Sequence, residues 1–170
     1  MSNIILETER LILRKIVVED ADALFQIQSN GDVMRYAING PNSEEGVYKF
    51  INSTLTRYDN DGIGQWAVVE KLSNSVIGDC GFSIKDIDRV REHDLSYRLS
   101  RKYWGKGFAT EAALACKNYG FKNLHLDRMI SIQDRDNKLS LKVVQKIGMT
   151  LMKETTFHHK IVLVYSINHP

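Results

Sequence analysis

The order of the expected elements predicts an α+β fold with a central mixed, mostly antiparallel sheet of about seven strands flanked by helices. Three apolar runs separated by turn residues between positions 65 and 99 predict an antiparallel meander. A strand, a helix and a strand follow one another from 93 to 133, which predicts a parallel crossover. Where the pairing changes, between the fourth and fifth strands, we expect the strand ends to splay and form a crevice for a ligand.

The N-terminal part is expected to supply the first strand and the first helices. Alternating and β-branched residues predict a strand over 10–18. Apolar spacing after two acidic residues predicts a helix over 21–29, and 32–36 is expected to form a short helical turn. Ser43 and the two glutamates after it begin another helix, whose apolar residues up to Tyr58 follow a period near 3.6.

The remainder of the chain alternates between strand and helix patterns. Strands are expected at 65–70, 76–84, 93–99, 128–133, 149–155 and 159–167, and helices at 110–123 and 137–147. The highly charged segment 85–92 is expected to be a solvated connection between two strands. No repeat or linker interrupts this order, so we expect residues 1–170 to form a single domain.

Composition restricts the class of partner only weakly. The chain has 23 basic and 21 acidic residues, a net charge of +2, which gives no reason to expect a nucleic-acid partner. The N-terminus lacks a basic leader and a long apolar segment, and the longest apolar stretch near the end, 161–165, has the length of a strand. We therefore expect a soluble, cytoplasmic protein with no membrane partner.

The cysteines and histidines do not suggest a metal site. Cys80 and Cys116 are far apart in the sequence and lie in apolar contexts, where free thiols usually belong to the core. His158 and His159 are neighbours near the start of an expected strand, and neighbouring strand residues point to opposite faces. We therefore expect no metal.

The segment from Tyr103 to Ala113 has the pattern of an anion site. Two glycines, Gly105 and Gly107, flank Lys106 directly before a run of helix formers. Backbone N–H groups in such a turn can approach an anion, and the helix dipole adds about half a positive charge there. A simple helix entry is the alternative. The P-loop spacing is absent, and a dinucleotide-binding fold would need its first strand near residue 95, too late in this chain.

Three separated segments resemble the GNAT superfamily of N-acetyltransferases. The segment from Trp104 to Ala109 is similar to its coenzyme A signature, Arg/Gln-x-x-Gly-x-Gly/Ala, with Trp104 in place of the leading Arg or Gln. That departure is familiar in the branch that contains the ribosomal-protein serine and alanine N-terminal acetyltransferases. The same branch also resembles the chain over 8–14, 103–112 and 137–149.

The resemblance implies acetyl-CoA as co-substrate. Its pyrophosphate is expected to bind the backbone amides of the glycine turn and the following helix, which comprise Gly105, Lys106, Gly107, Phe108, Ala109 and Thr110. Its pantetheine arm is expected to pair with the strand edge at Tyr97, Arg98 and Leu99.

Two residues of the next helix are further candidates for coenzyme A binding. Asn137 is expected to hold the pantetheine or to cap the helix, and the two roles are compatible. Lys138, Lys142 and Lys146 form one stripe at helical spacing. Lys142 is expected to meet a phosphate, with a solvated basic face as the alternative.

Acetyl transfer to an amine needs a neutral amine, a polarised thioester carbonyl and a proton for the departing thiolate. A backbone N–H near Ser96 or Tyr97 is expected to polarise the carbonyl. Val144 occupies the place where much of the superfamily has a tyrosine acid, so the resemblance indicates Ser140 as the proton donor or relay. Asp94 is expected to act as the base through water.

The acceptor is left open by the sequence. A peptide N-terminus fits the resembling branch, whereas a polyamine, an amino acid or a drug fits the chemistry equally well. A non-catalytic acyl-CoA-binding module is a third interpretation. The sequence is compatible with either a monomer or a homodimer. Aromatic residues in expected strands and loops could line the acceptor pocket or belong to the core, and these are Tyr36, Trp66, Phe82 and Tyr97.

Overall fold

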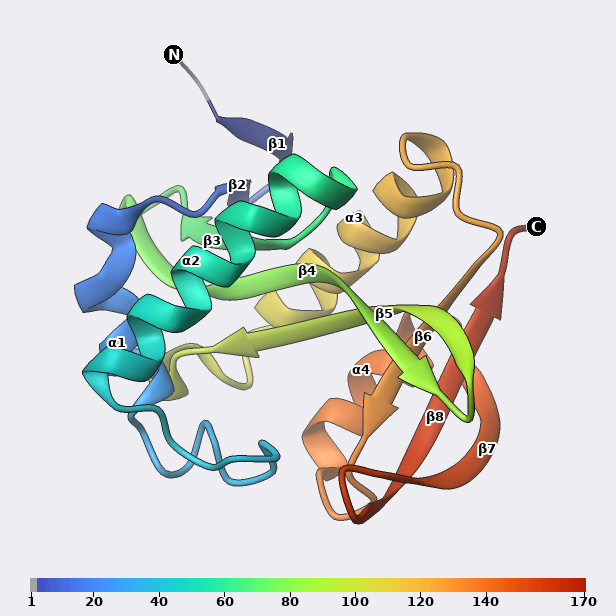
Figure 1. Ribbon diagram of the computed structural model, residues 1–170. Helices are drawn as coiled ribbons and strands as arrows, with labels where there is room; N and C mark the ends of the chain where they lie inside the picture. Colours follow the sequence, from blue (N-terminus) through green and yellow to red (C-terminus); the bar gives the residue numbers. More distant parts are fainter. Residues whose placement is uncertain (1–2) are drawn as a thin grey trace.

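Figure 1 shows the computed structural model of the protein, which describes residues 3–170. Within these residues, eight strands form one sheet in the order β1-β2-β3-β4-β5-β6-β8-β7. The strands are Ile4–Glu7 (β1), Leu11–Lys15 (β2), Gln65–Glu70 (β3), Ser75–Ile87 (β4), Val90–Leu99 (β5), Arg128–Gln133 (β6), Thr150–Phe157 (β7) and Lys160–Asn168 (β8). All neighbouring pairs are antiparallel except β5 and β6. The predicted mixed, mostly antiparallel sheet is confirmed.

Helices cover both faces of this sheet. In the described residues the α-helices are Ala21–Gln28 (α1), Glu44–Asp61 (α2), Phe108–Lys122 (α3) and Lys138–Lys146 (α4). In Figure 1, α2 lies in front of the strands and α3 behind them. Ala67 and Val68, neighbours on β3, are both fully buried, yet Ala67 packs with α1 and α2 while Val68 packs with α3 and α4. The alternation of side chains along the strand thus places these two neighbours in different hydrophobic clusters.

α2 begins after Ser43, as predicted from the sequence. The hydroxyl of Ser43 accepts a hydrogen bond from the backbone N–H of Gly46 at 3.1 Å, which caps the N-terminus. Gly62 ends the helix in the left-handed conformation, with φ +69°.

The prediction of a solvated connection over 85–92 is wrong. β4 continues to Ile87 and β5 begins at Val90, so only a tight turn separates them. Opposite charges stand directly across the two strands, Lys85 facing Glu92 and Asp86 facing Arg91. Such cross-strand pairs stabilise a hairpin, so the charges support strand formation here.

Three smaller differences concern β1, the start of α3 and the turn between β7 and β8. β1 was not expected as a strand, and it pairs with β2 at one edge of the sheet. α3 begins two residues earlier than expected, at Phe108. His158 and His159 form the turn between β7 and β8, both with positive φ, and do not alternate along a strand.

The fourth and fifth expected strands, 93–99 and 128–133, correspond to β5 and β6, and the predicted splay lies between these two. The two strands pair in parallel at Asp94 and Ile130. Beyond this point the C-terminal residues of both strands, 96–99 and 132–133, line one cleft. The change from antiparallel to parallel pairing therefore creates the crevice that the sequence predicted.

Candidate active site

A cleft of ≈ 740 Å³ opens at the splay. Its walls come from the end of β5, the glycine turn with the start of α3, the end of β6 with α4, and the loop 32–37. All predicted site residues except Asp94 and Lys106 contribute to these walls. They are Tyr97, Arg98, Leu99, Gly105, Gly107, Phe108, Ala109, Thr110, Asn137, Ser140 and Lys142.

The glycine turn opens backbone donors toward this cleft. Gly105 and Gly107 have φ of +74° and +82°, a conformation that other residues rarely adopt. Glu111 is the first residue of α3 whose N–H is bonded back along the chain, to the carbonyl of Gly107 at 3.0 Å. The N–H groups at the start of the helix therefore lack helical acceptors and can bind an anion.

The side chain of Lys106 lies outside the cleft wall. Its Nζ sits 5.6 Å from the centre of the Tyr103 ring, within the range of a cation–π contact. The sequence left open whether this side chain adds charge to the phosphate site or is solvated. Lys106 itself does not line the cleft, but the Tyr103 ring beside it does.

Trp104 fixes the turn to the neighbouring strand, a contact that the sequence did not predict. Its indole N–H donates to the carbonyl of Leu99 at 2.9 Å, and its ring lies 4.6 Å from the Arg101 guanidinium. Both Trp104 and Leu99 line the cleft. The tryptophan that replaces the leading Arg or Gln of the signature therefore connects the glycine turn with the end of β5.

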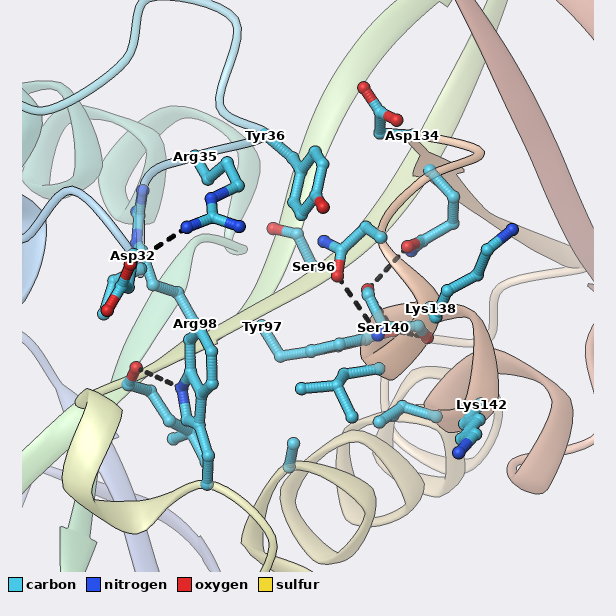
Figure 2. Close-up of a pocket in the computed structure, with 18 of the residues that line it drawn as sticks. Asp32, Arg35, Tyr36, Ser96, Tyr97, Arg98, Asp134, Lys138, Ser140 and Lys142 are labelled. Atoms are coloured by element: carbon cyan, nitrogen blue, oxygen red, sulfur yellow. Dashed lines mark hydrogen bonds and ion pairs between the residues drawn. The ribbon is translucent and has the colours of Figure 1, made fainter.

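Asn137 and Ser140 meet at the N-terminus of α4. The side-chain oxygen of Asn137 accepts from the backbone N–H of Ser140 at 3.3 Å, so Asn137 caps the helix. The hydroxyl of Ser140 lies 2.5 Å from Gln133 Oε1 and 3.0 Å from the Tyr97 hydroxyl. Tyr97 in turn donates to the backbone carbonyl of Ser140 at 2.8 Å. Figure 2 shows Tyr97 reaching across the cleft floor toward Ser140.

This contact belongs to a longer chain of hydrogen bonds. Gln133 donates to Ser131 at 2.7 Å, and Ser131 donates to the carbonyl of Leu95 at 2.8 Å. Burial raises the pKa of Tyr97 despite the opposing hydrogen bonds from Ser140 and Gln133, so its hydroxyl remains protonated at neutral pH. The sequence pattern did not single out Gln133, which stands at the end of an apolar strand where the splay begins.

Asp94 lies where β5 and β6 are paired and does not line the cleft. Its Oδ1 accepts the backbone N–H of Ile132 at 3.1 Å, and the residue is only 6% exposed. Burial raises the pKa of Asp94 to about 6 against the opposing effects of Lys85 and Ile132. The structure does not bring Asp94 and Ser140 to a common surface, and the base role of Asp94 stays a prediction.

We expect Asp94→Asn to gain stability relative to the wild type as the pH rises. The native pKa of about 6 exceeds the ordinary 3.8, so between these values the folded state holds the proton more tightly than the unfolded state. Stability of the wild type therefore falls as the pH rises through this window. The advantage of the variant should be larger at pH 7.5 than at pH 4.5 by about 2 kcal/mol, measured by urea unfolding. Equal effects at both pH values would contradict the raised pKa.

Arg98 faces the opposite side of the sheet from Tyr97. Its guanidinium pairs with Asp79, with Nε 3.2 Å from Oδ2, and Asp79 is only 2% exposed. Any pairing of Arg98 with a pantetheine arm therefore involves its backbone. An acidic residue inside an otherwise apolar strand could have indicated a buried ion pair at Asp79, but the sequence does not identify Arg98 as its partner.

The remaining walls contain aromatic and basic side chains. Tyr36 projects from the loop 32–37 toward Ser96, and Lys138 and Lys142 stand on α4 beside the cleft (Figure 2). Of the aromatic residues considered from the sequence, Tyr36 and Tyr97 line the cleft. Trp66 and Phe82 belong to the core.

Within residues 3–170, no group of three or more His, Cys, Asp or Glu side chains is placed to hold a metal ion. Among the helices of the same residues, none has the length and apolar character required to cross a membrane.

Comparison with known sequences identifies relatives over most of the chain. The acetyltransferase (GNAT) domain family matches residues 10–150. An uncharacterized N-acetyltransferase of Bacillus licheniformis is 34% identical over 144 residues, which cover 84% of this chain and 80% of the relative. The spermidine N(1)-acetyltransferase of Escherichia coli (strain K12) is 27% identical over 144 residues, covering 84% of this chain and 74% of that protein.

Solved structures share the architecture over nearly the full length. A GNAT-family acetyltransferase from Bacillus anthracis has a TM-score of 0.83 and 28% identity, covering 96% of this chain and 97% of that chain. A ribosomal L7/L12 α-N-protein acetyltransferase in complex with coenzyme A has a TM-score of 0.81 and 18% identity, covering 97% of both chains. At that identity, the second likeness shows the fold alone.

Proposed function

Because the chain belongs to the GNAT acetyltransferase family, we propose that it transfers an acetyl group from acetyl-CoA to a primary amine. The observation that carries this proposal is the glycine turn, whose unbonded helical N–H groups line the same cleft as Ser140 and Tyr97 at the splay of β5 and β6. One end of the cleft suits a diphosphate, and the other has neutral hydroxyl groups suited to a thioester.

The reaction joins the two substrates directly in a ternary complex. The neutral amine nitrogen attacks the acetyl carbonyl carbon, and the carbonyl oxygen is stabilised by a backbone N–H near Ser96 or Tyr97. The C–S bond then breaks, and the thiolate of coenzyme A takes a proton while the amine nitrogen loses one. The Ser140 hydroxyl gives its proton to sulfur and regains, through water, the proton that the amine nitrogen loses, so the number of protons is conserved. The amide oxygen of Gln133 fixes the orientation of that hydroxyl.

In this proposal the coenzyme runs from α3 to the splay. Backbone amides from Gly105 to Thr110 hold its pyrophosphate, and Lys142 adds positive charge from α4. The edge of β5 over 97–99 pairs with the pantetheine arm. Apart from Lys106, these residues all lie on the walls of a single cleft, which supports this path.

The acceptor is expected to enter beneath the loop 32–37, near Tyr36 and Ser96 (Figure 2). A protein N-terminus is our first candidate, supported by the resemblance to the ribosomal-protein acetyltransferase branch. A small polyamine is the second, supported by the spermidine N(1)-acetyltransferase among the relatives. The cytoplasmic location and the choice between monomer and homodimer stay predictions.

We expect the purified protein to release coenzyme A from acetyl-CoA only when an acceptor amine is present. Release is measured with a thiol reagent against a panel containing N-terminal Ser and Ala peptides, polyamines and amino acids. Peptide turnover supports the first candidate, and polyamine turnover the second. Coenzyme A binding without turnover of any amine would instead indicate a non-catalytic acyl-CoA-binding module.

A further inference from the structure

The glycine turn is held from behind by the segment that precedes β2. Arg10 is the centre of this contact: its Nη1 donates to the carbonyl of Lys106 at 2.9 Å, and its Nε donates to Glu111 Oε2 at 2.7 Å. Glu111 also accepts from the backbone N–H of Arg10 at 2.9 Å and from the Thr8 hydroxyl at 2.6 Å. The guanidinium lies 4.1 Å from the centre of the Phe108 ring. One arginine thus contacts the turn, the first residue of α3 and the first-turn carboxylate.

The bond to Lys106 fixes the direction of a neighbouring donor. The peptide between Lys106 and Gly107 is trans and planar, so its C=O and N–H point in opposite directions. Arg10 holds the C=O and lies outside the cleft wall, whereas Gly107 is part of that wall. A fixed carbonyl on the Arg10 side therefore aims the Gly107 N–H toward the cleft side.

The ion pair also cancels a charge that opposes anion binding. Glu111 lies in the first turn of α3, beside the N–H groups that would receive a diphosphate. Its partial burial alone would raise its pKa, but the hydrogen bonds from Thr8 and Arg10 outweigh this effect and lower the pKa. Glu111 is thus ionised at neutral pH, and an unpaired carboxylate at this place would repel a phosphate group.

We propose that Arg10 is a positioning residue for the diphosphate of coenzyme A, because it aims the Gly107 N–H at the cleft and neutralises Glu111. This inference rests on the proposed function. It assigns a binding role to the N-terminal segment, although Arg10 does not line the cleft itself.

The test compares Arg10→Gln with a matched control, Arg14→Gln. Arg14 lies in β2 and makes a similar two-pronged ion pair with Asp20, with both contacts at 2.8 Å, away from the cleft wall. We expect R10Q to weaken the Kd for coenzyme A, measured by calorimetry, by about tenfold, the loss expected for one charge-assisted contact. KM for acetyl-CoA should rise equally while kcat stays within about twofold. R14Q should lower the Tm without changing the Kd.

A substrate without the diphosphate separates positioning from general damage. We expect R10Q to leave kcat/KM for S-acetylpantetheine unchanged, because that thioester has no phosphate to be held. An unchanged Kd for coenzyme A in R10Q, or an equal loss with S-acetylpantetheine, would overturn the proposal.

If R10Q does not fold, Arg10→Lys provides a second test of the positioning role. Lysine preserves the charge but lacks the planar fork that reaches Lys106 and Glu111 together, so we expect a Kd between those of the wild type and R10Q. Wild-type affinity in R10K would overturn the positioning role. Failure of the wild-type protein to bind coenzyme A would instead contradict the proposed function, which keeps the two failures distinct.

Discussion

Replacing Gly107 by valine is expected to weaken coenzyme A binding roughly 100-fold, the loss of one or two charge-assisted hydrogen bonds. Gly107 has φ +82°, a conformation that a β-branched residue avoids, and its new Cβ would lie 3.4 Å from Arg10 Nη2. The turn must therefore rearrange, and its N–H groups lose their common direction. The measurements are the Kd for coenzyme A and the KM for acetyl-CoA.

Gly62→Val provides the control for left-handed strain. Gly62 has φ +69° and open space around its Cβ position, and it ends α2 outside the cleft wall. We expect this variant to lose stability while keeping its affinity for coenzyme A. An unaltered KM for acetyl-CoA in G107V would refute the phosphate site.

The second large effect is expected from Ser140→Ala, which removes the hydroxyl 2.5 Å from Gln133 Oε1 at the start of α4. If this hydroxyl protonates the departing thiolate, kcat should fall by about 100-fold, the usual contribution of a general acid. The Kd for coenzyme A should change little, because the backbone that caps and begins α4 is preserved. Steady-state kinetics together with calorimetry separate the two quantities.

Tyr97→Phe distinguishes the two hydroxyl groups. The Tyr97 hydroxyl donates to the backbone carbonyl of Ser140 and lies 3.0 Å from its side chain, so it is a second candidate proton source beside Ser140. We expect Y97F to reduce kcat less than S140A, because tyrosine positions α4 while serine handles the proton. A larger loss in Y97F would transfer the acid role to Tyr97, and unchanged turnover in S140A would exclude Ser140.

Much of the fold could be predicted because its signals are local. The apolar period of α2 and the glycines before α3 each depend on a few neighbouring residues. The charged segment 85–92 misled the prediction because its charges find partners across a strand pair. The number of charged residues in a segment does not show which residues lie opposite them on a neighbouring strand.

In the candidate site, the glycine turn, Asn137 and Ser140 could be predicted from residue spacing and family resemblance. The roles of Gln133 and of the Asp79–Arg98 pair could not be predicted, because they arise from contacts between different strands and helices. Asp94 was placed correctly on its strand, but its direction toward Ile132 was decided by how β6 lies against β5.

The sequence by itself determined that a glycine turn precedes a helix and that a crossover follows a meander, because backbone preferences and periodicity are written in neighbouring residues. Only the tertiary structure decided which side chains support that turn. Trp104 reaches the end of β5, and Arg10 approaches from a segment 96 positions away from the Lys106 carbonyl. Such contacts depend on packing between segments that are distant in the sequence. The sequence could therefore predict the glycine turn but not the side chains that hold it in place.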